Sequence, residues 1–174
     1  MAVREILFLG NPVLRMKSQR VEKINETVRE IITDLSDTLE RFRKTNGFGR
    51  GISAPQIGCS VRIIHINIGT SLVLINPKIV GRSRETMRLW DDCFSFPDIM
   101  VKLKRYKKIK VKYFDESMKE QTCDFIGDQS ELVQHEIDHL NGVLAIDRAI
   151  DTKHIILRSE WIKGKRPAGL ENIL

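Results

Sequence analysis

Two histidines separated by three residues are the part of the chain best suited to chemistry. They occur in the run His135-Glu136-Ile137-Asp138-His139. On a helix, His135 and His139 lie one turn apart, so both imidazoles project from the same face. That spacing lets two nitrogens bind one divalent ion, and Glu136 stands beside them to accept a proton from a metal-bound water. The run predicts a metal-dependent hydrolase.

The two histidines alone do not complete such a site. A catalytic metal ion of this kind takes three protein ligands and keeps one position open. The three cysteines, Cys59, Cys93 and Cys123, are odd in number and widely spaced, which does not predict a disulfide framework. Each is either a buried apolar residue or a metal ligand, and composition does not choose between them. The alternative interpretation is two structural histidines beside a solvated glutamate.

A helix must hold the histidines, and the local sequence predicts one over about 129 to 142. Asp128 is placed to be its N-cap, with Glu131 at the third helical position to complete a capping box. Gly142 is expected to end the helix.

The rest of the chain predicts one more helix and a group of strands. The helix covers about 25 to 45 and ends at Asn46-Gly47, and a loop rich in small residues follows over 47–58. Strands are predicted at about 61–66, 72–75, 85–90, 101–115 and 119–125. Because the strands are grouped between two helices, an α+β fold is expected rather than alternating βαβ units.

Composition indicates a folded globular chain of one domain. The chain has 174 residues, of which 41% are apolar and 30% charged, which excludes a disordered or fibrous protein. We expect a single catalytic domain over 1–150 and a basic C-terminal tail of the same domain over 151–174. No apolar run is long enough to span a bilayer, so a cytoplasmic location and no membrane partner are expected.

The formal charge of +6 favours contact with something anionic. Much of it lies in 101–115, where lysines alternate with apolar residues as on a half-buried strand. A solvated sheet face is favoured over a nucleic-acid groove, because Tyr106 is the only aromatic residue on the lysine face. We therefore expect no DNA partner, while contact with the ribosome through the basic surface is left open. The chain is expected to be a monomer or weak dimer.

Three segments, in the same order, resemble the signature motifs of the peptide deformylase family. They are Gly49-Arg-Gly-Ile-Ser-Ala-Pro-Gln-Ile-Gly58, Asp91-Asp-Cys-Phe-Ser-Phe-Pro97 and Gln134-His-Glu-Ile-Asp-His-Leu-Asn-Gly142. The resemblance begins at Gly10-Asn-Pro-Val-Leu-Arg15 and runs to about Asp147. It implies antiparallel or mixed β-sheets around a central helix that carries the histidines.

The resemblance also implies the ligand set and the reaction. Cys93 becomes the third ligand beside His135 and His139, and Fe²⁺ is the expected ion, with Zn²⁺ or Ni²⁺ as alternatives. The substrate is an N-formylated nascent peptide, from which the formyl group of formyl-methionine is hydrolysed and released as formate. Glu136 takes a proton from the attacking water and passes it to the leaving amine.

Further residues are assigned to the substrate by the same resemblance. The Gln56 side chain and the Phe94 backbone N–H are expected to stabilise negative charge on the formyl oxygen. Gly51 lets the loop approach the substrate backbone closely, and Ile52 is expected to help position it.

The second segment departs from the family pattern Glu-Gly-Cys-Leu-Ser. Asp91 keeps a carboxylate with a shorter reach, while Asp92 puts bulk and negative charge where the family has glycine. Arg50 also stands where a small or apolar residue is usual, and we expect it to neutralise Asp92. Arg50, Asp91 and Asp92 are assigned to the substrate pocket. These changes leave two alternatives to a deformylase: a paralogue that hydrolyses another small N-formyl or N-acyl amide, and an inactive metal-binding or ribosome-associated relative.

Overall fold

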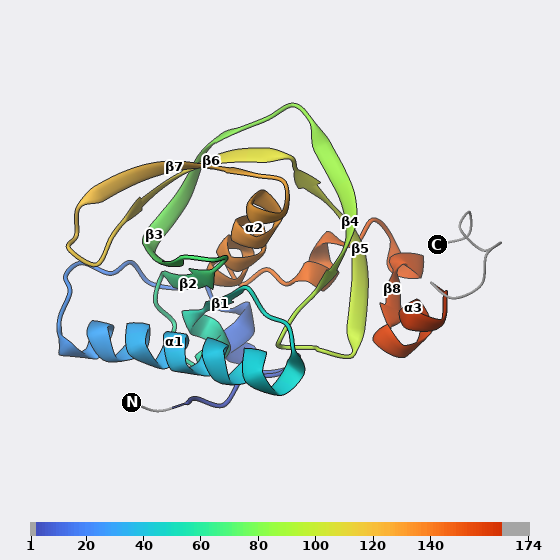
Figure 1. The fold of residues 1–174 in the computed structure, drawn as a ribbon, viewed down its shortest axis with the longest axis horizontal. Coiled ribbons are helices and arrows are strands. Elements are labelled where there is room, and N and C mark those ends of the chain that lie inside the picture. The colour runs from blue at the N-terminus through green and yellow to red at the C-terminus, as the bar shows by residue number, and fades with distance from the viewer. Residues whose placement is uncertain (1–2, 165–174) are drawn as a thin grey trace.

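The computed structural model describes residues 3–164, which form three helices and eight strands (Figure 1). The helices are α1 (Glu26–Asn46), α2 (Asp128–Leu140) and α3 (Arg158–Gly164). The strands are β1 (Gly51–Ser53), β2 (Ile63–Asn67), β3 (Ser71–Arg82), β4 (Thr86–Asp92), β5 (Ile99–Tyr106), β6 (Lys108–Phe114), β7 (Glu120–Ile126) and β8 (Ile155–Leu157). Short 3-10 helices cover Pro12–Arg15, Ala54–Ile57, Ala145–Arg148 and Thr152–His154.

The strands form two sheets with α2 between them. One sheet has the order β1-β2-β3-β6-β7, the other has β4-β5-β8, and every paired strand is antiparallel to its neighbour. Figure 1 shows α2 in the middle of the molecule and α1 along the outer side of β1 and β2. The predicted α+β fold with antiparallel sheets is confirmed.

Strand β2 is buried on both faces because it separates two cores. Ile63 belongs to the core that α1 covers, whereas Ile64 and Ile66 belong to the core around α2. The strand therefore lacks the alternation of a half-solvated sheet: residues 63–66 are all buried, and His65 is the polar residue among them. Its pairing with β1 fixes Gly51–Ser53 beside α2, which places a segment that was predicted to be loop inside the five-stranded sheet.

Helix α2 is an interior helix, and every residue from 130 to 140 is buried. The predicted capping box at its start is wrong. Gly127 occupies the N-cap position with φ 58°, and Asp128 is the first helical residue. Because no side chain caps the helix there, Glu131 is available for an ion pair with Arg50. The helix ends at Leu140, two residues before Gly142.

The predicted strand over 101–115 is also wrong, because the chain turns at Lys107 and the two halves enter different sheets. The alternation breaks off at Arg105-Tyr106-Lys107 but resumes in the same phase at Ile109, which hides the turn in the sequence. The lysines of β6 are matched by carboxylates of β7: Lys108 pairs with Asp124 at 2.8 Å and Lys112 with Glu120 at 2.7 Å. These ion pairs fit the solvated sheet face that the sequence favours.

The segment after residue 150 contains regular structure. Strand β8 pairs with β5, and α3 follows it directly. Residues 165–174, which include part of the predicted basic tail, lie outside the described residues. Within residues 3–164 no helix has both the length and the apolar character needed to cross a membrane.

Gly142 holds the end of α2 against the N-terminal segment. Its φ is 72°, and a Cβ added there would overlap the backbone carbonyl of Arg15. We expect Gly142→Ala to lower the free energy of unfolding by more than about 2 kcal/mol, because left-handed strain and a backbone clash add together. Urea denaturation followed by circular dichroism measures this loss.

Gly47 supplies the matched control. It has a φ of 76° after α1 but nothing within 4 Å of an added Cβ. Gly47→Ala should therefore cost only the strain of the left-handed conformation, about 1 to 2 kcal/mol. Equal losses for the two variants would show that the contact with Arg15 contributes nothing.

Candidate metal centre and active-site cleft

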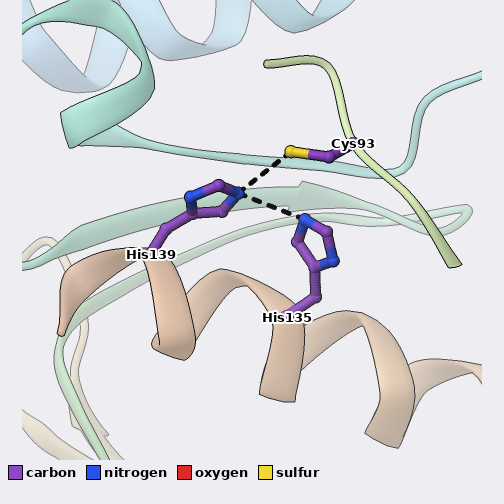
Figure 2. Close-up of side chains that lie close together, drawn as sticks. All are labelled: Cys93, His135 and His139. Atoms are coloured by element: carbon purple, nitrogen blue, oxygen red, sulfur yellow. Dashed lines mark hydrogen bonds between the residues drawn. The ribbon is translucent and has the colours of Figure 1, made fainter. Parts of the chain in front are cut away.

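Cys93, His135 and His139 converge in the interior of the protein (Figure 2). The two histidines project from α2, and Cys93 directly follows β4. His139 Nε2 lies 3.3 Å from Cys93 Sγ and 3.2 Å from His135 Nε2. All three residues are buried, with relative exposures of 3%, 6% and 1% in chain order.

These distances fit the ligands of one tetrahedral ion. Metal bonds of about 2.0 to 2.1 Å to nitrogen and about 2.3 Å to sulfur place two nitrogens roughly 3.3 Å apart and the sulfur roughly 3.5 Å from each. The distances of 3.2 and 3.3 Å are close to both values. One thiolate with two imidazoles suits a transition metal rather than Mg²⁺ or Ca²⁺. The geometry and the donor chemistry thus both fit a metal centre.

The two imidazoles differ in their affinity for protons. Burial opposes charge on His135, but the Asp91 carboxylate outweighs it and holds the pKa of His135 well above its usual value. Burial and the neighbouring His135 hold the pKa of His139 well below its usual value. The two histidines together therefore bind one proton readily and a second proton only with difficulty.

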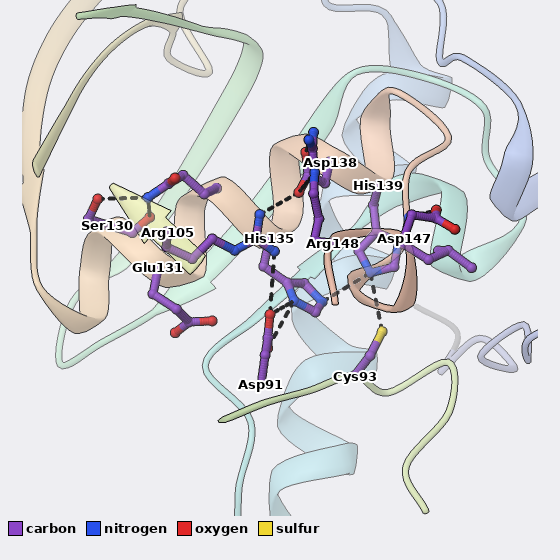
Figure 3. Close-up of polar contacts among 12 residues, drawn as sticks. Asp91, Cys93, Arg105, Ser130, Glu131, His135, Asp138, His139, Asp147 and Arg148 are labelled. Atoms are coloured by element: carbon purple, nitrogen blue, oxygen red, sulfur yellow. Dashed lines mark hydrogen bonds and ion pairs between the residues drawn. The ribbon is translucent and has the colours of Figure 1, made fainter. Parts of the chain in front are cut away.

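A chain of ion pairs holds the His135 ring in place (Figure 3). Asp91 accepts a hydrogen bond from His135 Nδ1 at 3.0 Å, which leaves Nε2 free to face the centre. Arg105 pairs with Asp91 at 3.4 Å and also with Asp138 on α2. Arg148 reaches Asp138 from the other side at 2.9 Å. These contacts fix the ring of His135 relative to β4 and β5.

Asp91 lines the cleft described below, and it also has a second role. The sequence assigned it to the substrate pocket, but its side chain is only 3% exposed and both of its oxygens contact His135. We assign Asp91 to orienting His135. Arg105 was missed, although it falls on the inward side of the alternation formed by Val101 and Leu103, where a charged residue requires a buried partner.

Glu136 lies beside the three converging residues at the bottom of a cleft and is almost fully buried. It is 3% exposed, and its Oε2 has no hydrogen-bond partner within residues 3–164. Burial raises the pKa of Glu136 to about 7. A Cβ added at Gly51 would approach Glu136 Oε1 to 3.1 Å and Leu132 Cδ1 to 3.0 Å. Only glycine at this position lets β1 lie so close to the carboxylate.

Gln56 presents its amide nitrogen to the same centre. Its Oε1 accepts hydrogen bonds from the Ser53 N–H and hydroxyl, both at 2.9 Å, which orients the amide group. The Nε2 then lies 3.7 Å from Cys93 Sγ. Phe94 follows Cys93 in a turn, and no acceptor within residues 3–164 takes its backbone N–H. Two donors thus flank the Cys93 sulfur.

The expected pairing of Arg50 with Asp92 is wrong. Arg50 instead pairs with Glu131 at 2.7 Å. Asp92 pairs with Arg158, the first residue of α3, at 2.6 Å. Arg158 also donates to the carbonyl of Pro97 at 2.6 Å, and its guanidinium lies 5.1 Å from the centre of the Phe48 ring. Glu131 and Asp92 are thus each paired with an arginine, and the arginine that pairs with Asp92 is Arg158 rather than the predicted Arg50.

A cleft of about 500 Å³ opens above the three converging residues. Nine of the eleven predicted site residues line it: Arg50, Gly51, Gln56, Asp91, Asp92, Cys93, Phe94, His135 and Glu136. His139 lies beneath the cleft, and the Ile52 side chain is fully buried in the core that α1 covers. Ile52 therefore offers only its backbone to a substrate.

Sequence reasoning missed several residues that line the cleft. They are Arg43, Phe48, Leu132 and Arg158, and Glu131 was expected only as a cap. Leu132 and Glu131 lie on the predicted helix, one turn before the histidines, so their helical spacing is a signal for both. Arg158 has no such signal, because it lies in a basic segment without a motif.

Comparisons with known proteins show similarity to one family over most of the chain. The family model described as Polypeptide deformylase matches residues 3–154. The peptide deformylase of Pseudothermotoga lettingae is 38% identical over 161 residues, covering 92% of this chain and 91% of that protein. The crystal structure of peptide deformylase from Thermotoga maritima superposes with a TM-score of 0.81 at 35% identity, covering 87% of this chain and all of that one. One from Legionella pneumophila has a TM-score of 0.81 at 34% identity, covering 88% and 89%.

Asp91→Asn tests the support of His135. An amide cannot match the charge of Arg105 or hold the imidazole as a carboxylate does, so affinity for a divalent transition metal should fall about 10- to 100-fold. Competition with a chromophoric chelator measures the affinity. Asp124→Asn, an exposed residue of β7, is the matched control and should leave the affinity unchanged. Equal affinities for the two variants would remove Asp91 from this role.

Proposed function

The chain belongs to the polypeptide deformylase family, and we propose that its Cys93, His135 and His139 bind one divalent transition metal ion. The family makes it an enzyme, a metal-dependent hydrolase that removes the N-formyl group from nascent peptides. The observation that carries the proposed site is the convergence of one sulfur and two nitrogens beside the buried Glu136 carboxylate.

We propose Fe²⁺ as the resident ion, with Zn²⁺ and Ni²⁺ able to replace it. Imidazole suits all three ions, and a thiolate ligand disfavours the hard cations. When bound, such an ion acidifies a water molecule and polarises the carbonyl of the formyl group. The remaining steps belong to side chains of the chain itself.

Glu136 moves the proton in this scheme. It accepts a proton from the water that attacks the formyl carbon, and it gives that proton to the amine nitrogen as the carbon–nitrogen bond breaks. Its burial supports this role, because a carboxylate with a pKa near 7 can both take and return a proton at neutral pH. The products are formate and a peptide with a free amino group.

Gln56 and Phe94 stabilise the charge that develops on the formyl oxygen. The Gln56 Nε2 is held in place by the contacts of its own Oε1 with Ser53. The Phe94 N–H is available next to Cys93. Donors that are oriented before the reaction need no reorganisation when the charge appears.

The cleft suits a short, N-terminal segment of extended peptide. Phe48, Phe94 and Leu132 give its wall apolar surface for a methionine side chain, and the backbone at Gly51 lies at its edge. We propose that the enzyme acts in the cytoplasm, as a monomer or weak dimer, on chains emerging from the ribosome. In this proposal ribosomal RNA contacts the basic surface of the enzyme, and neither DNA nor a membrane is a partner.

The assay that tests this function is formate release from a formyl-Met peptide by protein loaded with Fe²⁺ under anaerobic conditions. Glu136→Gln should lower kcat about 10²- to 10⁴-fold, because the amide cannot take the proton. Metal analysis should find the same metal content in the variant and the wild type. Glu120→Gln, on the exposed face of β7, is the control and should keep full activity. Unchanged turnover by Glu136→Gln would contradict the mechanism. If the wild type hydrolysed other formyl amides but not the formyl-Met peptide, the result would favour a paralogue with a different substrate.

A second test asks whether the Asp92–Arg158 ion pair at the rim of the cleft affects substrate binding. Arg158→Met should raise KM for formyl-Met peptides several-fold with little change in kcat, because it leaves the Asp92 carboxylate unpaired beside the substrate path. Asp92→Gly should remove this penalty, so that the double variant matches Asp92→Gly alone. Additive effects in steady-state kinetics would show that the two residues act independently.

A further inference from the structure

A second cavity, of about 460 Å³, lies against a different face of α2. Gln134 and Asp138 of α2 form one wall, β3 contributes residues 79–82, and β5 contributes residues 104–106. Arg148, at the end of a 3-10 helix, completes it. None of the residues that line it lines the substrate cleft. The two cavities are therefore separate sites.

Positive charge dominates this cavity. Its lining holds four cationic side chains, Arg82, Lys104, Arg105 and Arg148, but only one carboxylate, Asp138. Asp138 is matched by Arg105 and by Arg148, and the other end of Arg105 is matched by Asp91. Two positive charges are left without a carboxylate.

Arg82 and Lys104 are the cations without acidic partners. Arg82 donates to the Tyr106 hydroxyl at 3.1 Å, and its guanidinium lies 5.1 Å from the centre of that ring. This contact orients the guanidinium without neutralising it. Neither Arg82 nor Lys104 forms an ion pair with any residue in the described range 3–164. Elsewhere on the basic surface, by contrast, the lysines of β6 are paired with carboxylates of β7.

We propose that this cavity binds the phosphate group of a small molecule. Two unmatched positive charges correspond to the charge of a phosphate monoester, and the planar fork of an arginine fits phosphate oxygens in pairs. The concave site is large enough for the phosphate and a short carbon skeleton. A flat RNA surface is a poorer match, because the only aromatic ring in the lining, Tyr106, already lies beneath Arg82.

The floor of the cavity is the same network that supports the metal centre. Arg105 is 4% exposed and joins Asp138 at the cavity to Asp91 beneath His135 (Figure 3). The ligand contacts are thus assigned to the exposed Arg82 and Lys104, and to the half-exposed Arg148. Arg105 remains a structural residue, so the cavity can be tested without disturbing the catalytic machinery.

Isothermal titration calorimetry on the full, metal-loaded chain tests the proposal. The probes are glycerol 3-phosphate and inorganic phosphate, with glycerol as the uncharged control. Saturable binding of both phosphates is expected, and Arg82→Ala or Lys104→Ala should weaken it about tenfold, since each removes a charge-assisted hydrogen bond. Both side chains are exposed, so the variants should fold like the wild type. Phosphate should also raise the melting temperature of the wild type more than that of either variant.

Lys23→Ala is the matched control, because Lys23 is exposed and lies outside the cavity. It should bind phosphate as the wild type does. The proposal is overturned by any of three results: no saturable binding, equal binding by wild type and all three variants, or binding of a single-stranded polyuridine without binding of the small phosphates. Deformylase activity is not the readout, so this outcome is independent of the function proposed above.

Discussion

The ion pairs between Arg105 and two buried carboxylates, Asp91 and Asp138, are the interaction on which the rest of the structure depends. A charge in a protein interior is costly unless it is paired and hydrogen-bonded. Arg105 is 4% exposed, so β5 must deliver it to carboxylates from β4 and α2 at once. Satisfying this single side chain fixes the three elements relative to one another. It thereby fixes the distance between Cys93, which follows β4, and the histidines on α2.

The same constraint explains why the convergence of Cys93, His135 and His139 could be predicted and their surroundings could not. His135 and His139 are four residues apart on one helix, so their geometry is local and follows from the helical repeat. Cys93 lies 42 residues before His135, and only the family resemblance connected it to them. The ion pairs of Arg50 and Asp92 bring together residues that are distant in the chain, and charge alone did not identify the partners.

The errors in the predicted elements have equally physical causes. The alternation of apolar and basic residues breaks off at Arg105-Tyr106-Lys107 but resumes in the same phase in β6, so periodicity gave little sign of the turn at Lys107. At the start of α2, Asp128 has the right residue type for a cap, but Gly127 takes that position with a backbone that only glycine adopts easily. In both places the type of element, strand or helix, was predicted correctly. The position of its boundary was not, because the sequence pattern did not mark it.

The arrangement of β8 and α3 has a consequence for the order in which the enzyme is made. These elements cover 155–164 and are synthesised after every other strand and helix of the described chain. They nevertheless supply Arg158, which spans the cleft rim to Asp92 and Phe48. The residues proposed to bind the metal precede these elements in the chain, so the rim of the cleft depends on a segment that is made after them. An enzyme that acts on unfinished proteins thus has a substrate cleft whose rim is completed only by the last described helix of its own chain.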